Sequence, residues 1–405
     1  MHDKTVLIVG NFAFPKGNAA GKRVLGLGYL FEELGYRVFY VGCQCNRYTN
    51  RITDTKQVYE NFTYYNFNGD RCLKNICNVS NTFNDFRQIA IEVGIENIAL
   101  IVIYGSPVLA LWIQKVIIFG KKNHIPTVFD CVDWIEKSGF KSVIKNVVKY
   151  IDTNYMKRYL ACKCDGVIAI SRYLYDYYKG KGCKTVLIPP VGKMESKGLQ
   201  KNKKINIENI KNDCVRFVYA GSIPLVNSNN REDWKDRVDL TFEIMSKLHE
   251  QGVNYIFDVF GIEKKQYITA VPEHEAVLDK LELKVIFHGK TSNDIVCEYI
   301  RKADFTILNR IVTKVTTAGF PSKISESLLL GTPVITNATS NISEYVKNGD
   351  NGLIIDFDTN KAVGEVLAYL VDRSQIINMK NKCKVECCFD ICQFKDSMKK
   401  FIDSL

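Results

Sequence analysis

The sequence predicts two doubly wound α/β domains in succession, and three observations point to this fold class. Short apolar runs such as Val6–Val9 and Ile98–Tyr104 are each followed by a glycine, and they alternate with segments of helical periodicity. Two such series follow each other, separated by a Lys- and Asn-rich stretch over 192–212. The length of 405 residues fits two or three domains. We therefore expect a first domain over 1–190, a linker over 191–213, a second domain over 214–375, and C-terminal helices over 376–405 that pack back across the domain junction.

The first series contains six expected strands, each of which is short and apolar. They are Val6–Val9, Val38–Val41, Ile98–Tyr104, Thr127–Cys131, Gly166–Ile170 and Thr185–Ile188. A helix over Ala20–Leu34 joins the first two, and the stretch from Thr49 to Asp85 reads as irregular and polar. Gly17 in the first turn suits either a phosphate-cradling loop or a simple turn. Asp133 follows a strand at its carboxyl end, where open α/β sheets place their sites, although a turn aspartate is equally consistent.

The second series begins at Val215 and closes on one stretch around which the chain is organised. Its other expected strands are Tyr255–Phe260, Val285–His288, Phe305–Leu308, a strand beginning at Val334, and Leu353–Asp356. In the stretch Thr317–Ile335, Gly319 and Pro321 make a loop. Ser322 is placed to cap a helix over Lys323–Leu330, and Gly331 is placed to end it.

Two residues on that short helix could carry chemistry. Lys323 and Glu326 are three residues apart, so they share one face in the first turn. A phosphate at the helix N-terminus would meet the helix dipole and the Lys323 ammonium together. Glu326 could accept two hydrogen bonds from a ribose diol. An ordinary solvated first turn explains the pair equally well when it is taken alone.

Composition and charge exclude some classes of protein. Hydrophobic content of 46% and charged content of 24% are typical of soluble globular chains, and no secretory signal pattern is present. The fourteen cysteines have irregular spacing and no C-x-x-C pair, which predicts reduced thiols in a cytoplasm and no metal site. The net charge of +11 suits an anionic membrane, nucleic acid or phosphorylated substrates. Without a nucleic-acid-binding motif, we expect no nucleic-acid partner.

A long amphipathic helix is expected from Lys141 to about Cys164. Lys141, Lys145 and Lys149 form a basic stripe at four-residue spacing. The apolar side comprises Ile144, Val147, Val148 and Ile151. Such a helix could lie on an anionic bilayer, or it could expose a solvated basic face while packing on a core.

The order of the motifs resembles a known family. CDGVIAIS, VYAGS followed by Lys235, FHGK, GFPSKISESLLLGTPVI and NGDNGLIID occur in succession. Together they resemble bacterial glycosyltransferases of the GT-B fold, in the retaining family 4 group (glycosyl transferases group 1). The resemblance implies two Rossmann-like domains facing a central cleft, which would be the default ligand site.

The resemblance also implies roles for single residues. Glu326 matches the glutamate that binds the ribose of a sugar nucleotide, and Lys235 matches the lysine that grips the donor diphosphate in catalysis. Gly17 matches a glycine loop near that diphosphate. The implied donor site comprises Gly17, Lys235, Gly319, Phe320, Ser322, Lys323 and Glu326.

Three positions depart from the family pattern. Ala318 stands where a second glutamate usually contacts the transferred sugar. Ser222 stands where a basic residue is usual, and Arg231 or Arg237 could compensate. The family often has a histidine after the strand Thr127–Cys131, and Asp133 is our candidate to orient the acceptor or the sugar instead.

By resemblance, the expected activity is retaining, metal-independent transfer of a hexose-type sugar without a cofactor. The donor is a nucleotide sugar, and the acceptor is a glycan or lipid-linked glycan in bacterial surface polysaccharide synthesis. The protein is expected in the cytoplasm or on the inner face of the cytoplasmic membrane. A non-catalytic nucleotide-binding or scaffold protein of the same shape is the alternative that Ala318 and Ser222 keep open. A sugar-nucleotide epimerase is less well matched, because none of the five histidines falls in a suitable loop.

Overall fold

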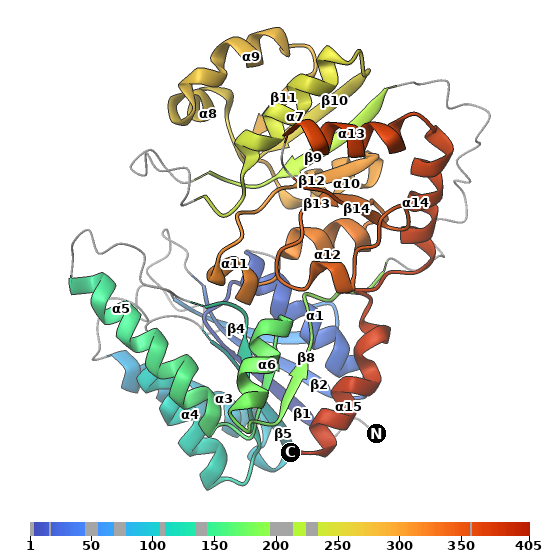
Figure 1. Ribbon diagram of the computed structural model, residues 1–405. Coiled ribbons are helices and arrows are strands. Elements are labelled where there is room, and N and C mark those ends of the chain that lie inside the picture. The colour runs from blue at the N-terminus through green and yellow to red at the C-terminus, as the bar shows by residue number, and fades with distance from the viewer. Residues whose placement is uncertain are drawn as a thin grey trace. The chain divides into compact units, whose positions relative to one another are not determined.

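The computed structural model describes residues 4–15, 18–44, 56–68, 78–105, 110–134, 144–194, 214–223, 234–356 and 359–405. The chain forms two compact units (Figure 1). Unit 1 comprises Met1–Lys193, Ala318–Phe320 and Ile391–Leu405, and unit 2 comprises Met194–Thr317 and Pro321–Asp390. None of the helices within the described ranges combines the length and the apolar character needed to cross a membrane.

Unit 1 contains an eight-stranded sheet with the order β3-β4-β2-β1-β5-β6-β7-β8. Its strands are β1 Thr5–Gly10, β2 Arg37–Gln44, β3 Gln57–Tyr59, β4 Phe62–Asn68, β5 Ile98–Tyr104, β6 Thr127–Cys131, β7 Gly166–Ala169 and β8 Thr185–Leu187. Its longer helices are α1 Ala19–Glu33, α3 Asn78–Val93, α4 Ala110–Lys122, α5 Ile144–Tyr155, α6 Arg172–Gly180 and α15 Lys395–Asp403. Short helical turns are η1 Ile95–Asn97, the π-helical η2 Met156–Leu160, η3 Ala161–Lys163 and η8 Ile391–Phe394.

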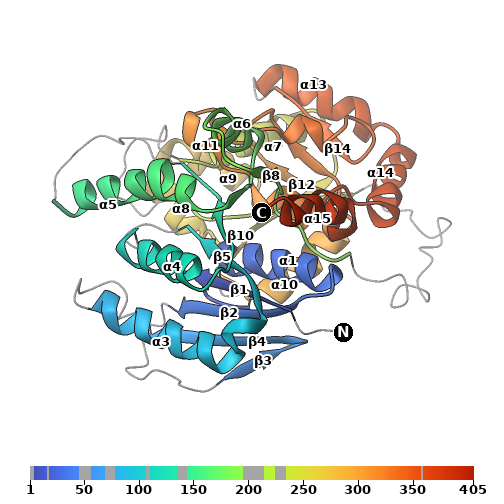
Figure 2. The same cartoon turned by 90° about the horizontal axis from the view of Figure 1, so that it is seen from below.

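The sheet of unit 1 is covered by helices on both faces. Helices α3, α4 and α5 lie on one face, and α1 and α15 lie on the other (Figure 2). All neighbouring strands are parallel except the edge pair β3 and β4. Every residue of β1 is buried, as expected for a central strand of a parallel sheet. This is the doubly wound arrangement predicted from the alternating pattern.

The segment between Thr49 and Asp85 is not irregular throughout, and that prediction is wrong. It contains β3, β4 and the beginning of α3. Strand β4 pairs in parallel with β2, and β3 turns back beside it. Phe62 and Tyr65 of β4 are buried. The Thr and Asn residues between the aromatic residues of β4 interrupt the apolar pattern by which a strand is recognised in a sequence. Such polar positions are tolerated here because β4 lies close to a sheet edge.

The segment after α14 completes the core of unit 1. Ile391, Met398 and Phe401 of η8 and α15 belong to the same buried cluster as the residues of β1 and α1. Gly166 at the start of β7 leaves room for this contact, because a Cβ there would lie 2.5 Å from the Phe401 ring. Unit 1 is therefore built from segments that lie far apart in the sequence.

Unit 2 contains a six-stranded parallel sheet with the order β11-β10-β9-β12-β13-β14. Its strands are β9 Val215–Ala220, β10 Tyr255–Phe260, β11 Val285–Gly289, β12 Phe305–Leu308, β13 Val334–Thr336 and β14 Gly352–Ile354. Its helices are α7 Val238–Glu250, α8 Lys264–Ala270, α9 Glu275–Lys280, α10 Asn293–Lys302, α11 Lys314–Ala318, α12 Ser322–Leu329, α13 Thr359–Leu370 and α14 Arg373–Val385. Short turns are η6 Pro272–His274 and η7 Ile342–Glu344. The strand predicted at Phe305–Leu308 is confirmed residue for residue.

One buried carboxylate joins three elements of unit 2. Asp304, just before β12, accepts two hydrogen bonds from the Arg373 guanidinium of α14, at 2.8 and 2.9 Å. It also accepts from the Arg216 backbone N–H of β9 at 2.8 Å. A bidentate Arg–carboxylate pair fixes orientation as well as distance. This pair therefore sets helix α14 against the sheet.

Candidate functional site

The sheet of unit 2 has a topological switch point between β9 and β12. Strands β10 and β11 continue from one side of β9, and β13 and β14 continue beyond β12 on the other side. Open parallel sheets bind ligands outside the carboxyl ends of their strands at such a point. The chain leaves β9 at Gly221 and leaves β12 at Asn309. The loops after these two strands frame the candidate site.

A carboxylate surrounded by basic side chains occupies this place. Lys323 forms an ion pair with Asp236, and the Arg310 Nε lies 3.2 Å from the Oδ1 of the same carboxylate. Lys235, which precedes Asp236, is exposed, and its charge also acts on Asp236. The Lys323 Nζ lies 5.0 Å from the centre of the Tyr219 ring. Two cations thus pair with one carboxylate and a third lies next to it in the chain, and this excess of positive charge suits an anion such as phosphate.

The charge state of Asp236 follows from its neighbours. Burial by itself would raise the pKa of Asp236, but the attraction of Lys323 and Arg310 outweighs it, and the pKa lies below its ordinary value. The carboxylate is therefore ionised at neutral pH. In that state it holds the two cations close to each other despite their like charge.

Arg310 is a site residue that the sequence analysis missed. Its backbone forms an antiparallel bridge with Asp236. On its other side, the Asn337 side chain accepts from the Arg310 N–H at 2.9 Å and donates to its carbonyl at 2.8 Å. The Arg310 side chain is only 11% exposed. The one signal that could have found it is its position directly beyond a strand at the carboxyl edge of the sheet.

The two arginines considered as substitutes for a basic residue at Ser222 are placed differently. Arg237 binds the Asp239 carboxylate through its Nε at 2.9 Å and its Nη2 at 2.7 Å. Arg231 lies outside the described residues. Among the arginines that the structure describes here, Arg310 is the one directed at Asp236.

Helix α12 begins one residue earlier than predicted. The expected cap by Ser322 is wrong, because Pro321 occupies the cap position and Ser322 is the first helical residue. The Ile324 N–H donates to the Pro321 carbonyl at 3.1 Å, which starts the helix without a side-chain cap. The N–H groups of Ser322 and Lys323 thus lie in the first turn, where helices leave donors for anions. The predicted end is confirmed, because Gly331 has φ of 78°.

Glu326 lies one turn further along α12, beside α10. It is half-buried. The Cys297 thiol of α10 donates to its Oε1 at 3.8 Å, and the Asn293 amide donates to the Cys297 sulfur at 3.4 Å. These contacts orient the Glu326 carboxylate on the side of α12 that faces α10.

The lack of a side chain at Gly221 makes room for this cluster. A Cβ built there would overlap the Tyr219 hydroxyl and would lie 2.5 Å from the Lys323 Nζ.

We expect Gly221→Ala to displace the Lys323 ammonium and to weaken binding of a nucleoside diphosphate about tenfold or more, equivalent to one lost charged contact of about 1.5–3 kcal/mol. Isothermal titration would measure this loss. Gly364→Ala is the control, since a Cβ there would meet nothing within 4 Å. Unchanged affinity in Gly221→Ala would contradict the proposed role of this gap.

Two aspartates of unit 1 lie near the carboxyl end of β6 and have different partners. Asp130 is fully buried and accepts from Arg23 Nη2 at 2.8 Å and Nε at 3.2 Å, while Arg23 Nη1 donates to the Pro189 carbonyl at 2.6 Å. Asp133 is half-exposed and forms an ion pair with the buried Lys157 ammonium. Asp130 is therefore a structural residue, whereas Asp133 presents a fixed carboxylate to solvent.

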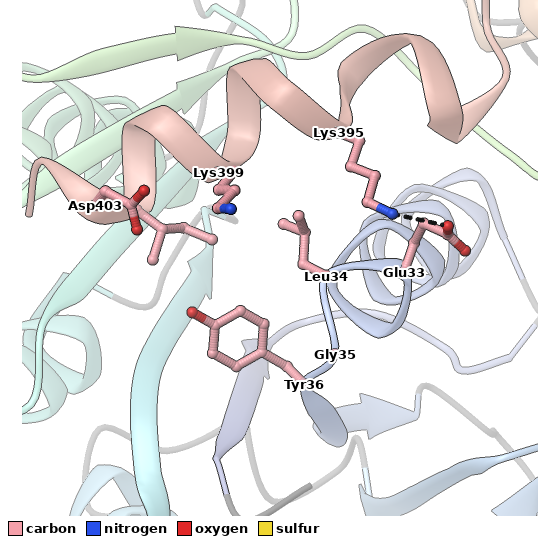
Figure 3. A pocket seen from close by; sticks show the side chains of 8 residues that line it. Glu33, Leu34, Gly35, Tyr36, Lys395, Lys399 and Asp403 are labelled. Atoms are coloured by element: carbon pink, nitrogen blue, oxygen red, sulfur yellow. Dashed lines mark hydrogen bonds and ion pairs between the residues drawn. The ribbon is translucent and has the colours of Figure 1, made fainter. Parts of the chain in front are cut away.

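A hollow of about 370 Å³ lies elsewhere in unit 1, between the end of α1 and α15. Figure 3 shows the Lys395 ammonium reaching the Glu33 carboxylate across it, at 3.1 Å. Burial and the nearby Asp403 raise the pKa of Tyr36, which lines the same hollow. Because Tyr36 precedes β2, this hollow lies at the amino ends of the strands, away from the edge where such sheets bind ligands.

The remaining predicted residues fall into two groups. Gly17 and Lys141 lie outside the described residues, and of Lys145 and Lys149 only the helical backbone of α5 is described. Gly319 and Phe320 lie between α11 and α12 and group with unit 1.

Within the described ranges, no group of three His, Cys, Asp or Glu side chains could hold a metal ion.

Comparison with known proteins assigns a family to the region that contains this cluster. Residues 224–385 match the family described as Glycosyl transferases group 1. The match covers most of unit 2 and less than half of the chain. No curated protein sequence matches the chain.

The fold of the whole chain resembles solved glycosyltransferases. Sucrose-phosphate synthase from Thermosynechococcus elongatus is 13% identical, with a TM-score of 0.64, and the match covers 99% of this chain and 100% of that one. HepE of Anabaena, solved with UDP, is 14% identical with a TM-score of 0.63, over 99% and 100% of the two chains. A glycosyltransferase from Rickettsia africae is 13% identical with a TM-score of 0.64, over 99% and 98%. The chain therefore has the GT-B fold, and the resemblance to group 1 glycosyltransferases is confirmed.

The matched region contains Lys235, Arg310, Lys323 and Glu326. The family and the fold support a glycosyl transferase activity. The charged cluster is the part of this region whose geometry suits a phosphorylated ligand.

Proposed function

We propose that the protein transfers a hexose-type sugar from a nucleotide sugar to a glycan or lipid-linked glycan, in the synthesis of a bacterial surface polysaccharide. The observation that carries this proposal is the pairing of Arg310 and Lys323 with Asp236 at the switch point of the unit 2 sheet, beside the charge of Lys235. HepE, which shares the fold, has been solved with UDP and with UDP-glucose. In such a donor, the diphosphate is the part that cations and a helix N-terminus would bind.

In the proposed reaction, the bond between the anomeric carbon and the diphosphate oxygen breaks, and the diphosphate leaves with the electron pair. Lys323, Arg310 and Lys235 stabilise the charge that develops on it, together with the N–H groups at Ser322. Each such donor contributes about 2–4 kcal/mol by analogy with oxyanion-hole groups. We propose that the site needs no metal ion, because these cations can serve the same electrostatic purpose.

The acceptor hydroxyl forms the new bond at the anomeric carbon and gives its proton to the departing phosphate oxygen. We propose that attack occurs on the face from which the diphosphate leaves, so that the configuration is retained, as in the group that the sequence resembles. Glu326 is assigned to the ribose hydroxyls. Asp133, held by Lys157, is assigned to orient the acceptor or the transferred sugar.

Arg310 bears on the alternative of a non-catalytic scaffold. That alternative rested on the absence of a basic residue at Ser222 and of a carboxylate at Ala318. A cation from the end of β12 supports a working diphosphate site without a basic residue at Ser222. The epimerase alternative is weakened, because His288 bonds to Asp258 at 2.7 Å and His274 bonds to the Tyr267 hydroxyl at 2.8 Å.

A thermal-shift panel of UDP-, GDP-, ADP- and CMP-sugars tests the donor site first. A ligand at 100 times its Kd should stabilise the protein by about 2.7 kcal/mol, which gives a measurable rise in Tm. We expect one nucleotide class to give this rise, and we expect Glu326→Ala and Lys235→Ala to abolish it. A panel in which no nucleotide shifts the Tm would contradict the proposal and favour the scaffold alternative.

A further inference from the structure

Helices α4 and α5 form an outer surface of unit 1 that carries exposed apolar side chains. The two helices lie side by side in both views of unit 1 (Figures 1 and 2). We call this surface the α4–α5 face. Its exposed apolar residues are Leu111, Ile118, Val147, Ile151, Tyr155 and Tyr159.

The apolar residues form one stripe on each helix. Val147, Ile151, Tyr155 and Tyr159 follow at four-residue steps, so they lie on one side of α5 and its continuation η2. The rings of Tyr155 and Tyr159 are stacked with their centres 5.3 Å apart, which shows that the stripe continues through the change from α- to π-helix. Ile151 is 61% exposed.

The inward side of this helical segment is formed by residues near its C-terminal end. Met156 and Leu160 are fully buried, together with the stem of Lys157. Val147 and Ile151 belong to the apolar side for which the sequence left two orientations open, and both are exposed. A surface helix normally turns its apolar stripe to the core, and a solvent-facing stripe marks a surface that another apolar phase covers.

The charged groups beside the stripes are mainly cationic. The Lys163 ammonium lies 4.3 Å from the centre of the Tyr159 ring, and Lys121 and Lys122 end helix α4. Helix α4 contains no acidic residue. The carboxylate of Asp152 on α5 accepts from the Ala110 N–H at 3.2 Å, so it is directed to the start of α4.

We propose that the α4–α5 face docks on an anionic lipid bilayer. Aliphatic side chains can enter the upper acyl region, tyrosines suit the headgroup level, and lysines at the border meet anionic headgroups. The positive charge around the apolar stripes is the reason to choose an anionic bilayer over a neutral protein surface. Docking does not depend on the transfer reaction, but it would bring the enzyme to an acceptor held in a membrane.

Co-sedimentation of the whole chain with vesicles tests this inference. We expect binding to phosphatidylcholine vesicles that contain phosphatidylglycerol, with much weaker binding to phosphatidylcholine alone and at high salt. Ile151→Glu should lower the partition coefficient roughly tenfold to a hundredfold, because it removes one large apolar side chain from the bilayer. Lys121→Glu with Lys122→Glu should lower it on anionic vesicles only.

Leu283→Glu and Val371→Glu are the matched controls, since both residues are highly exposed in unit 2, at 90% and 86%. They should bind vesicles as the unmodified chain does. The nucleotide-induced Tm rise of Ile151→Glu should be unchanged, which separates failure of this inference from failure of the donor site. Equal vesicle binding by Ile151→Glu and the controls would overturn the inference. The inference would also be overturned if the unmodified chain were a dimer and Ile151→Glu converted it into a monomer without altering vesicle binding.

Discussion

Replacing Lys323 or Arg310 by alanine is expected to lower kcat/KM for sugar transfer on the order of 10²–10³-fold each. Both cations are fixed before any ligand arrives, because Asp236 pairs with them and remains ionised. Preorganised charges stabilise a departing diphosphate without a reorganisation cost at the moment of reaction. Steady-state kinetics with the nucleotide sugar found by the thermal-shift panel would measure the loss. Lys302→Ala is the control, since this exposed lysine pairs with Glu298 on the surface of α10.

Comparison of a nucleoside diphosphate with its nucleoside gives a sharper test of the same assignment. If Lys323 and Arg310 contact the diphosphate, their alanine variants lose affinity for the diphosphate and keep their affinity for the nucleoside. Glu326→Ala should weaken both ligands, because both contain the ribose. Parallel loss of both ligands in Arg310→Ala would instead show a general disturbance of the loop after β12, and would remove Arg310 from the site.

Arg23→Ala is expected to destabilise unit 1 by about 3–5 kcal/mol, which is the largest stability effect that we foresee. The Arg23 and Asp130 side chains are 4% and 0% exposed, so the change leaves the Asp130 carboxylate buried without its partner. Urea unfolding followed by tryptophan fluorescence would show an earlier transition. Because the chain has two units, the shift should be read from the transition that belongs to unit 1.

Lys395→Ala provides the contrasting control for this measurement. Its ion pair with Glu33 is well exposed on both sides, at 43% and 40%, and such pairs contribute less than about 1 kcal/mol. Replacing both Arg23 and Asp130 by apolar residues should recover part of the lost stability, since the double variant leaves no unpaired charge. An Arg23→Ala chain as stable as Lys395→Ala would show that water reaches Asp130, and would refute the argument from burial.

The strongest sequence predictions concern features that are local in the chain. Apolar runs such as Phe305–Leu308 identify buried strands, and Gly331 marks a helix end through its backbone conformation. The choice of Lys323 also follows from local spacing. Arg310 could not be chosen in this way, because its role depends on Asp236, which approaches it only through the pairing of two distant loops. The sequence also identified the apolar side of α5 but left its direction open, because periodicity does not say which way an apolar side faces.

The position of η8 and α15 has a consequence for the order in which the protein matures during translation. Ile391, Met398 and Phe401 are part of the core that β1 and α1 begin, yet all of unit 2 is synthesised between them. Domains of most chains fold in the order in which they leave the ribosome. Here unit 2 can close its core while the first unit still exposes the surface that α15 will cover. Of these two units, the one whose synthesis begins first is thus completed second.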